Sequence, residues 1–159
     1  MKKLLLICLA VFASSVVSAQ SMDDSEMKIV QDLWGKEKKK AVEEFLALEE
    51  GESTTAFWAI YDEYEDARKV LGKQRFDIIN EYLDVYSEIS DEKAAELMKG
   101  VFSYRKGLAS LQEKTYKKIA KSNGAKMGAL FIQIENHFDN AVDMALGQTL
   151  PYAGEQDGE

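Results

Sequence analysis

Apolar residues recur every three or four positions from Met27 to Leu146, and this spacing is the strongest constraint on the fold. It is the repeat of an amphipathic helix, in which one face packs against a core and the opposite face meets water. No stretch alternates apolar and polar residues over a useful length, and the single proline, Pro151, lies near the end of the chain. The sequence therefore predicts one all-α domain over residues 27–150, without a sheet.

Breaks in the apolar pattern divide this region into four predicted helices. The first helix runs from Met27 to about residue 48, and the second from about Ser53 to Tyr86. The third begins after Ser90 and ends near Lys121, and the fourth follows Gly124 and ends at Gly147. Connections this short favour neighbouring antiparallel helices. We expect four helices that form a long helical hairpin or open bundle, and two chains that form a homodimer.

The segment around Ser90 has the features of a helix start. The Ser90 hydroxyl can accept a hydrogen bond from the first turn, and Lys93 occupies the capping-box position. Asp91 and Glu92 suit the positive end of the helix dipole. These residues predict a helix boundary at 89–93.

Residues 1–19 have the pattern of a secretory signal peptide. Lys2 and Lys3 form a basic start, residues 4–17 are apolar, and Val17–Ala19 has the small-x-small pattern of a cleavage site. The apolar stretch is short for a bilayer span, so a retained membrane anchor is less favoured. We expect cleavage after Ala19 and a soluble periplasmic protein without stable membrane insertion. Loss of the two lysines would change the formal net charge from −8 to −10.

Both ends of the mature chain lack the helical pattern. Residues 20–26 are polar, which predicts a flexible N-terminus. Residues 151–159 follow the proline and are rich in acidic residues and glycine, which predicts a disordered tail.

Several classes of chemistry are disfavoured by composition. The chain has one histidine, His137, and one cysteine, Cys8, too few for a histidine-rich metal cage, a cysteine-ligated metal or an internal disulfide. The negative charge disfavours nucleic-acid binding, which requires a basic surface. We interpret the carboxylates at residues 62–66 as a hydrated helix face rather than a catalytic pair, and residues 36–40, with four lysines, as a solvated face. We therefore expect no enzymatic activity, no cofactor and no bound metal.

Three segments resemble a known family. Ile89–Met98 resembles the Leu-Thr-x-x-Gln helix-start motif of the Spy/CpxP-like periplasmic proteins, with Ser90 at the threonine and Lys93 at the glutamine position. Phe57–Tyr64 resembles the Phe-Trp-x-Ile-Tyr-x-Glu-Tyr stretch of related exported helical proteins, and Gly128–Phe138 is similar to the last helix of that group. The resemblance covers about residues 40–146. It implies an ATP-independent chaperone, a regulator of an envelope-stress sensor, or a partner in extracytoplasmic sigma-factor signalling.

The aromatic residues supply the candidate binding surface. A thin layer of four helices cannot bury all of them, and tyrosine tolerates water because its ring is apolar and its tip is polar. Arginines on the same helices can add ionic contacts. We predict that unfolded clients, envelope proteins or a sensor or anti-sigma domain bind through Trp58, Tyr61, Tyr64, Arg68, Tyr82, Tyr86, Phe102, Tyr104 and Arg105.

Two alternatives remain open from the sequence. A four-helix bundle can hold b-type haem between a methionine on its first helix and a histidine on its last, and Met27 and His137 occupy such places. A covalent c-type haem is excluded, because the chain has no Cys-x-x-Cys-His motif. The second alternative is a metal-responsive sensor that binds divalent ions through its carboxylates.

Overall fold

The computed structural model describes residues 24–155, apart from the side chains of residues 24–30 and 32. Over this range the chain forms four α-helices and one short 3-10 helix, and no strand, which confirms the predicted all-α class. The elements are α2 (Asp24–Leu46), α3 (Glu52–Leu83), η1 (Tyr86–Glu88), α4 (Asp91–Asn123) and α5 (Ala125–Thr149). The predicted signal peptide at residues 1–19 lies outside the described residues.

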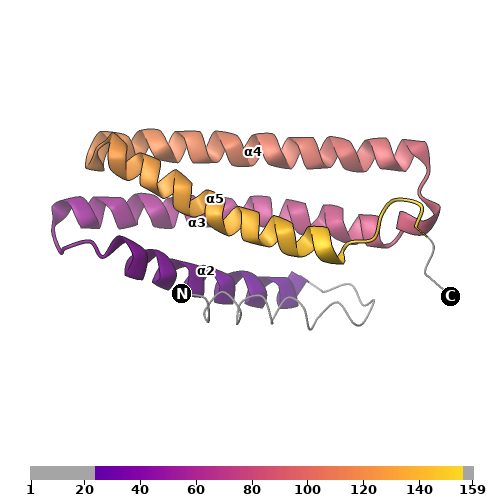
Figure 1. The fold of residues 1–159 in the computed structure, drawn as a ribbon, viewed down its shortest axis with the longest axis horizontal. Helices are drawn as coiled ribbons and strands as arrows, with labels where there is room; N and C mark the ends of the chain where they lie inside the picture. Colours follow the sequence, from indigo (N-terminus) through magenta and orange to yellow (C-terminus); the bar gives the residue numbers. More distant parts are fainter. Residues whose placement is uncertain (1–23, 156–159) are drawn as a thin grey trace.

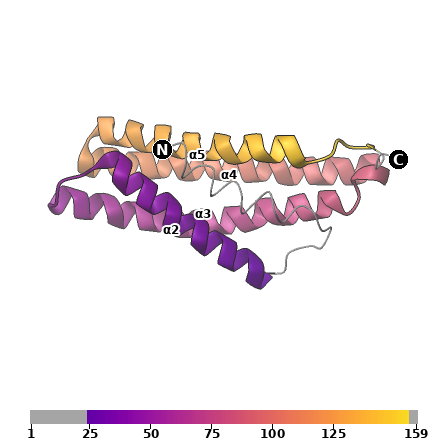
Figure 2. The same ribbon diagram turned by 60° about the horizontal axis from the view of Figure 1, so that its bottom comes forward.

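The two longest helices, α3 and α4, form an antiparallel hairpin. They contain 32 and 33 residues, which makes each about 50 Å long at 1.5 Å per residue. Figure 1 shows α5 starting beside the end of α4 and running back across the hairpin towards α3. Helix α2 crosses α3 obliquely, so that its first turns diverge from the other helices (Figure 2). The molecule is therefore an open bundle, as the sequence predicts.

Two of the predicted helix boundaries are confirmed. The Ser90 hydroxyl accepts a hydrogen bond of 3.2 Å from the backbone N–H of Lys93 and caps α4. At the other end of α4, Gly124 has a φ of 91°, a left-handed conformation that suits glycine. This single residue ends α4 and precedes α5, so the turn between the two helices is tight.

The second predicted helix is shorter than expected. Helix α3 ends at Leu83, three residues before the predicted end at Tyr86, and Tyr86 begins η1. The apolar spacing continues through Val85 and Tyr86, which hid the boundary in the sequence. Of the segment predicted to be flexible, 20–26, residues 24–26 form the first turn of α2, and residues 20–23 are not described.

The structure describes part of the tail that the sequence predicts to be disordered, residues 151–155, and these residues contact the end of the α3 segment. The Tyr82 hydroxyl donates a hydrogen bond of 2.6 Å to the carbonyl oxygen of Pro151. The backbone N–H of Gly154 donates to the carbonyl oxygen of Tyr86, also at 2.6 Å. These bonds fix residues 151–155 against the end of α3 and η1, and residues 156–159 lie outside the described range.

The apolar core lies where all four α-helices meet, near the end of the molecule that contains the 47–51 loop and the Gly124 turn. Its aromatic residues pack edge to face, with the ring centroids of Tyr64 and Phe131 5.0 Å apart. Edge-to-face pairs of this kind stabilise beyond their buried area. The buried residues of this core are Val42, Phe57, Tyr61, Tyr64, Ile119, Phe131 and Ile134.

Candidate functional site

A group of charged side chains lies inside this core. We call it the ionic cluster: Lys38 of α2, Glu65 and Arg68 of α3, and Glu135 and Asp139 of α5. The side chains of Lys38 and Glu135 have no exposed area. Lys38 Nζ lies 2.6 Å from Glu135 Oε2 and 2.7 Å from Glu65 Oε1. One lysine therefore joins α2 to both α3 and α5.

The second cation of the ionic cluster, Arg68, pairs with Asp139. Gln112 of α4 donates a hydrogen bond of 3.1 Å to the other oxygen of Asp139, so all four α-helices contribute to this polar network. The Tyr64 hydroxyl donates to Glu135 Oε2 at 2.8 Å, the oxygen that also accepts from Lys38. Buried charges of this kind are tolerated only when they are paired and hydrogen-bonded.

Aromatic rings enclose the ammonium group of Lys38. Its Nζ lies 6.0 Å from the ring centroid of Tyr61, 5.5 Å from that of Tyr64 and 5.7 Å from that of Phe138. A cation over a ring face gains electrostatic energy, and the gain is larger where water is excluded. The site thus holds one cation by two carboxylates and three rings.

The ionic cluster contains one carboxylate more than it has cations. Burial raises the pKa of Glu135 above its ordinary 4.5, although Lys38 opposes the shift. Burial and the neighbouring glutamates also raise the pKa of Tyr61 and Tyr64, which keeps both hydroxyls protonated. Within the described part of the chain, Glu135 Oε1 and the Tyr61 hydroxyl have no hydrogen-bond partner. Glu135 is therefore the carboxylate of the ionic cluster that has both a raised pKa and an oxygen without a hydrogen-bond partner.

The raised pKa of Glu135 leads to a pH-dependent stability. Because the folded chain binds this proton more tightly than the unfolded chain, the contribution is complete below the ordinary pKa of 4.5 and is lost as pH rises through the raised pKa. Glu135→Gln imitates the protonated carboxyl and removes the effect. We expect the melting temperature of Glu135→Gln, relative to wild type, to increase from pH 4 to pH 8 in calorimetric scans. A difference that stays constant with pH would contradict the assignment.

The structure brings four of the predicted binding residues together at the ionic cluster, of which Arg68 is a member. Trp58, Tyr61, Tyr64 and Arg68 follow one face of α3, and the rings of Trp58 and Tyr61 are in edge-to-face contact at 5.5 Å. Tyr61 and Tyr64 are buried, with 0% and 1% of their surface exposed, and Arg68 is half-buried. The predicted surface position is therefore wrong for the two tyrosines, because α2 and α5 cover the face on which they lie.

The other predicted binding residues lie elsewhere. Tyr82 and Tyr86 are in contact near the end of α3, with ring centroids 6.2 Å apart. Tyr104 is half-buried beneath Arg75, whose guanidinium carbon lies 5.6 Å from its ring centroid. Phe102 and Arg105 are exposed on α4. The predicted set therefore does not form one continuous surface.

The residues of the haem alternative can be placed only in part. His137 is exposed on α5, and its ring contacts Phe138 edge to face at 6.0 Å. Met27 belongs to the backbone of α2, but its side chain lies outside the described part. Among the described residues no group of three histidine, cysteine, aspartate or glutamate side chains is arranged to hold a metal ion. None of the described helices is both long and apolar enough to span a bilayer.

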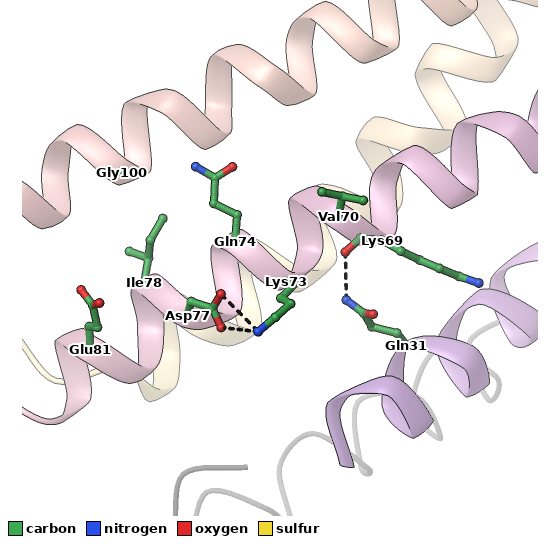
Figure 3. Close-up of a pocket in the computed structure, with 9 residues that line it drawn as sticks. All are labelled: Gln31, Lys69, Val70, Lys73, Gln74, Asp77, Ile78, Glu81 and Gly100. Atoms are coloured by element: carbon green, nitrogen blue, oxygen red, sulfur yellow. Dashed lines mark hydrogen bonds and ion pairs between the residues drawn. The ribbon is translucent and has the colours of Figure 1, made fainter. Parts of the chain in front are cut away.

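An open hollow of about 540 Å³ lies where α2 diverges from α3 (Figure 3). Gln31 of α2 donates a hydrogen bond of 3.1 Å to the carbonyl oxygen of Lys69 at one side. Lys73 and Asp77 form an ion pair along α3, and Ile78 faces Gly100 of α4 at the other side. The other two charged side chains of the lining pair with residues outside it, Glu81 with Lys93 and Lys69 with Asp66.

Sequence reasoning missed the most buried charges in the described part of the chain. The interpretation of residues 36–40 as a solvated face is wrong for Lys38, which has 2% of its surface exposed. The interpretation of the α3 carboxylates as a hydrated face also fails for Glu65, which contacts Lys38. One signal was available: Lys38 lies four residues before Val42, and Glu135 lies four residues after Phe131, so each shares a helical face with a core residue.

Comparison with models of known protein families, with curated proteins and with solved structures finds no significant match in any of the three.

Proposed function

We propose that this protein is a non-enzymatic binding protein of the periplasm, exported by a cleaved signal peptide. It holds unfolded clients, or the domain of an envelope-stress sensor, against a partly apolar helical face. The proposal continues the resemblance of Ile89–Met98 and Phe57–Tyr64 to the Spy/CpxP-like proteins.

The observation that supports the proposal best is an exposed apolar pair on α4. Met98 and Phe102 lie one turn apart and have 46% and 52% of their surface exposed. Arg105, also exposed, lies one turn further on the same side of the helix. We call these three residues the α4 face. A flexible methionine, an aromatic ring and an arginine suit weak contacts with many apolar or acidic chains. In the homodimer that we propose, two such faces would pack together.

The test uses light scattering from reduced insulin, whose B chain aggregates. We expect the purified protein, added at an equimolar ratio, to lower the scattering by about half or more, because the α4 face covers apolar surface of the client. The double variant Met98→Ser/Phe102→Ser should lose most of this effect.

The matched control is Met144→Ser/Tyr152→Ser, which removes the same kinds of side chain from positions with 62% and 81% of their surface exposed. It should keep the activity of wild type. Equal loss in both double variants would show that the α4 face has no special role. No suppression by wild type, together with no partner recovered from periplasm, would refute the function.

A further inference from the structure

Helix α2 differs from the other helices in how it is held. Helices α3, α4 and α5 pack along one another, whereas α2 crosses α3 obliquely and diverges from it (Figure 2). The 47–51 loop leads from α2 to the rest of the chain, with Ala47 in a left-handed conformation at φ 41°. Gln31 and Lys39 of α2 bond to α3 at the surface, and the buried contacts of the helix include a row of side chains along one stripe.

This stripe repeats every four residues. Trp34 contacts the ring of Phe138 edge to face at 6.1 Å. Lys38 enters the ionic cluster, Val42 is buried with 1% of its surface exposed, and Leu46 packs against the core. Residues four apart form one ridge of a helix, and such a ridge fits the groove of a neighbouring surface. Helix α2 therefore lays an aromatic residue, a cation and two aliphatic residues along a groove.

The groove under this stripe is formed by α3 and α5. We call it the α2 groove: Tyr61, Tyr64 and Glu65 on α3, with Phe131, Glu135 and Phe138 on α5. It has apolar rings along its length and carboxylates at the level of Lys38. Two of the tyrosines that the sequence predicts for partner binding, Tyr61 and Tyr64, lie in this groove rather than on the exposed surface.

Charge determines what can occupy the α2 groove. Without Lys38 the ionic cluster would keep three carboxylates and a single guanidinium, so the groove would hold an excess of two negative charges. A buried carboxylate that loses its nearest cation is costly. A purely apolar helix would leave Glu135 with the Tyr64 hydroxyl and with Arg68, whose Nε lies 3.7 Å from Glu135 Oε2. Glu135 Oε1 also retains an unused acceptor in the described part of the chain. Where Glu65 and Glu135 are ionised, the groove therefore favours an occupant that carries a cation at this level.

We propose that the α2 groove is a helix-binding site that α2 occupies in the isolated chain and that a partner helix can take over. The partner is an amphipathic helix with a lysine or arginine in the place of Lys38, an aromatic residue one turn before it, and aliphatic residues one and two turns after it. This site is distinct from the α4 face, and a partner gains access when α2 is displaced. Helix-in-groove recognition of this kind uses anchors at one-turn spacing.

The test uses a fluorescent peptide of residues 24–48 as the probe and anisotropy as the readout. The receptor is the purified protein, either as wild type or as Lys38→Met, whose own α2 no longer fits the groove. We expect the peptide to bind Lys38→Met about tenfold more tightly than wild type or better, because the tethered α2 of wild type competes at a high effective concentration. Circular dichroism checks that the variant remains helical, and Val42→Asp provides a second way to release α2.

Two further peptides test whether binding requires the positive charge of Lys38. A peptide with Lys38→Met should bind about tenfold more weakly or worse, whereas a peptide with Lys39→Met should bind within about threefold of the parent. The peptide with Lys39→Met is a matched control, because Lys39 pairs with Asp62 at the surface rather than in the α2 groove. The same ranking is expected on wild type at higher peptide concentrations.

Equal binding of the parent peptide to wild type and to the released variants would overturn the proposal, as would indifference to the Lys38 substitution. Neither result bears on insulin aggregation, which depends on Met98 and Phe102, so failure here and failure of the proposed function can be told apart.

Discussion

Lys38→Met is expected to lower the free energy of unfolding by about 3–5 kcal/mol near pH 8, because it leaves the buried Glu135 with only its more distant cation, Arg68, whose Nε lies 3.7 Å from Oε2. Methionine preserves most of the volume of the lysine side chain, so the loss reports charge rather than a cavity. Urea unfolding measures it, and amide hydrogen exchange should show α2 opening while the α3–α4 hairpin stays protected. The loss should shrink as pH falls, because a protonated Glu135 no longer needs the cation.

The neighbouring Lys39→Met is the control for this prediction. Lys39 also forms an ion pair, with Asp62 at 2.5 Å, but the two side chains are 35% and 56% exposed. Exposed pairs contribute about 1 kcal/mol or less. If Lys38→Met and Lys39→Met had similar stabilities, the ionic cluster would not hold α2 as described.

A second substitution shows whether Lys38→Met destabilises the chain through the lost ion pair with Glu135 or through lost packing. Lys38→Met/Glu135→Leu removes both charges together, and replacement of a buried pair by apolar residues is often close to neutral. We expect the double variant to recover most of the loss. Recovery should be incomplete, since the Tyr64 hydroxyl then loses its acceptor.

The fold was predictable because its local signals agree with one another. The apolar spacing, the Ser90 cap and the Gly124 stop each point to the same helices, and the structure contains those helices. The boundary at Leu83 was not predictable, because Val85 and Tyr86 continue the apolar spacing into η1. The order of residues 151–155 was also hidden, since it depends on Tyr82, which is distant in sequence from Pro151.

The ionic cluster was harder to predict for a physical reason. A lysine among lysines is most often solvated, and composition gives no sign that one of them is buried. Lys38 is stable in the core because two carboxylates face it, Glu65 and Glu135, which follow it by 27 and 97 residues along the chain. Periodicity places each residue on a helical face, but it does not say which two faces meet. The same limit explains why Tyr61 and Tyr64 were predicted to be exposed. The sequence places them on one face of α3, but it does not show that α2 and α5 cover this face.

The second large effect on stability is expected where α5 approaches α4 closely, at Gly128. Gly128 of α5 is buried against α4, and a Cβ built there would lie 2.8 Å from Tyr116 Cδ2 and 3.2 Å from the carbonyl oxygen of Tyr116. The ring can rotate away, but the carbonyl belongs to the backbone of α4, and the Gly124 turn next to it is tight. Overpacking of this kind typically costs about 1–3 kcal/mol. Gly128→Ala is therefore expected to destabilise the chain by that amount in urea unfolding.

Gly147→Ala is the matched control on the same helix, because no atom lies within 4 Å of the Cβ it would add. Alanine is a better helix former than glycine by up to about 1 kcal/mol, so this variant should be unchanged or more stable. The double variant Gly128→Ala/Tyr116→Ala removes the ring contact and keeps the backbone contact. If the backbone limits the approach, Gly128→Ala costs nearly as much in the Tyr116→Ala background as in wild type, and the coupling energy is small. A stabilising Gly128→Ala would mean that α4 and α5 can separate at this point without loss.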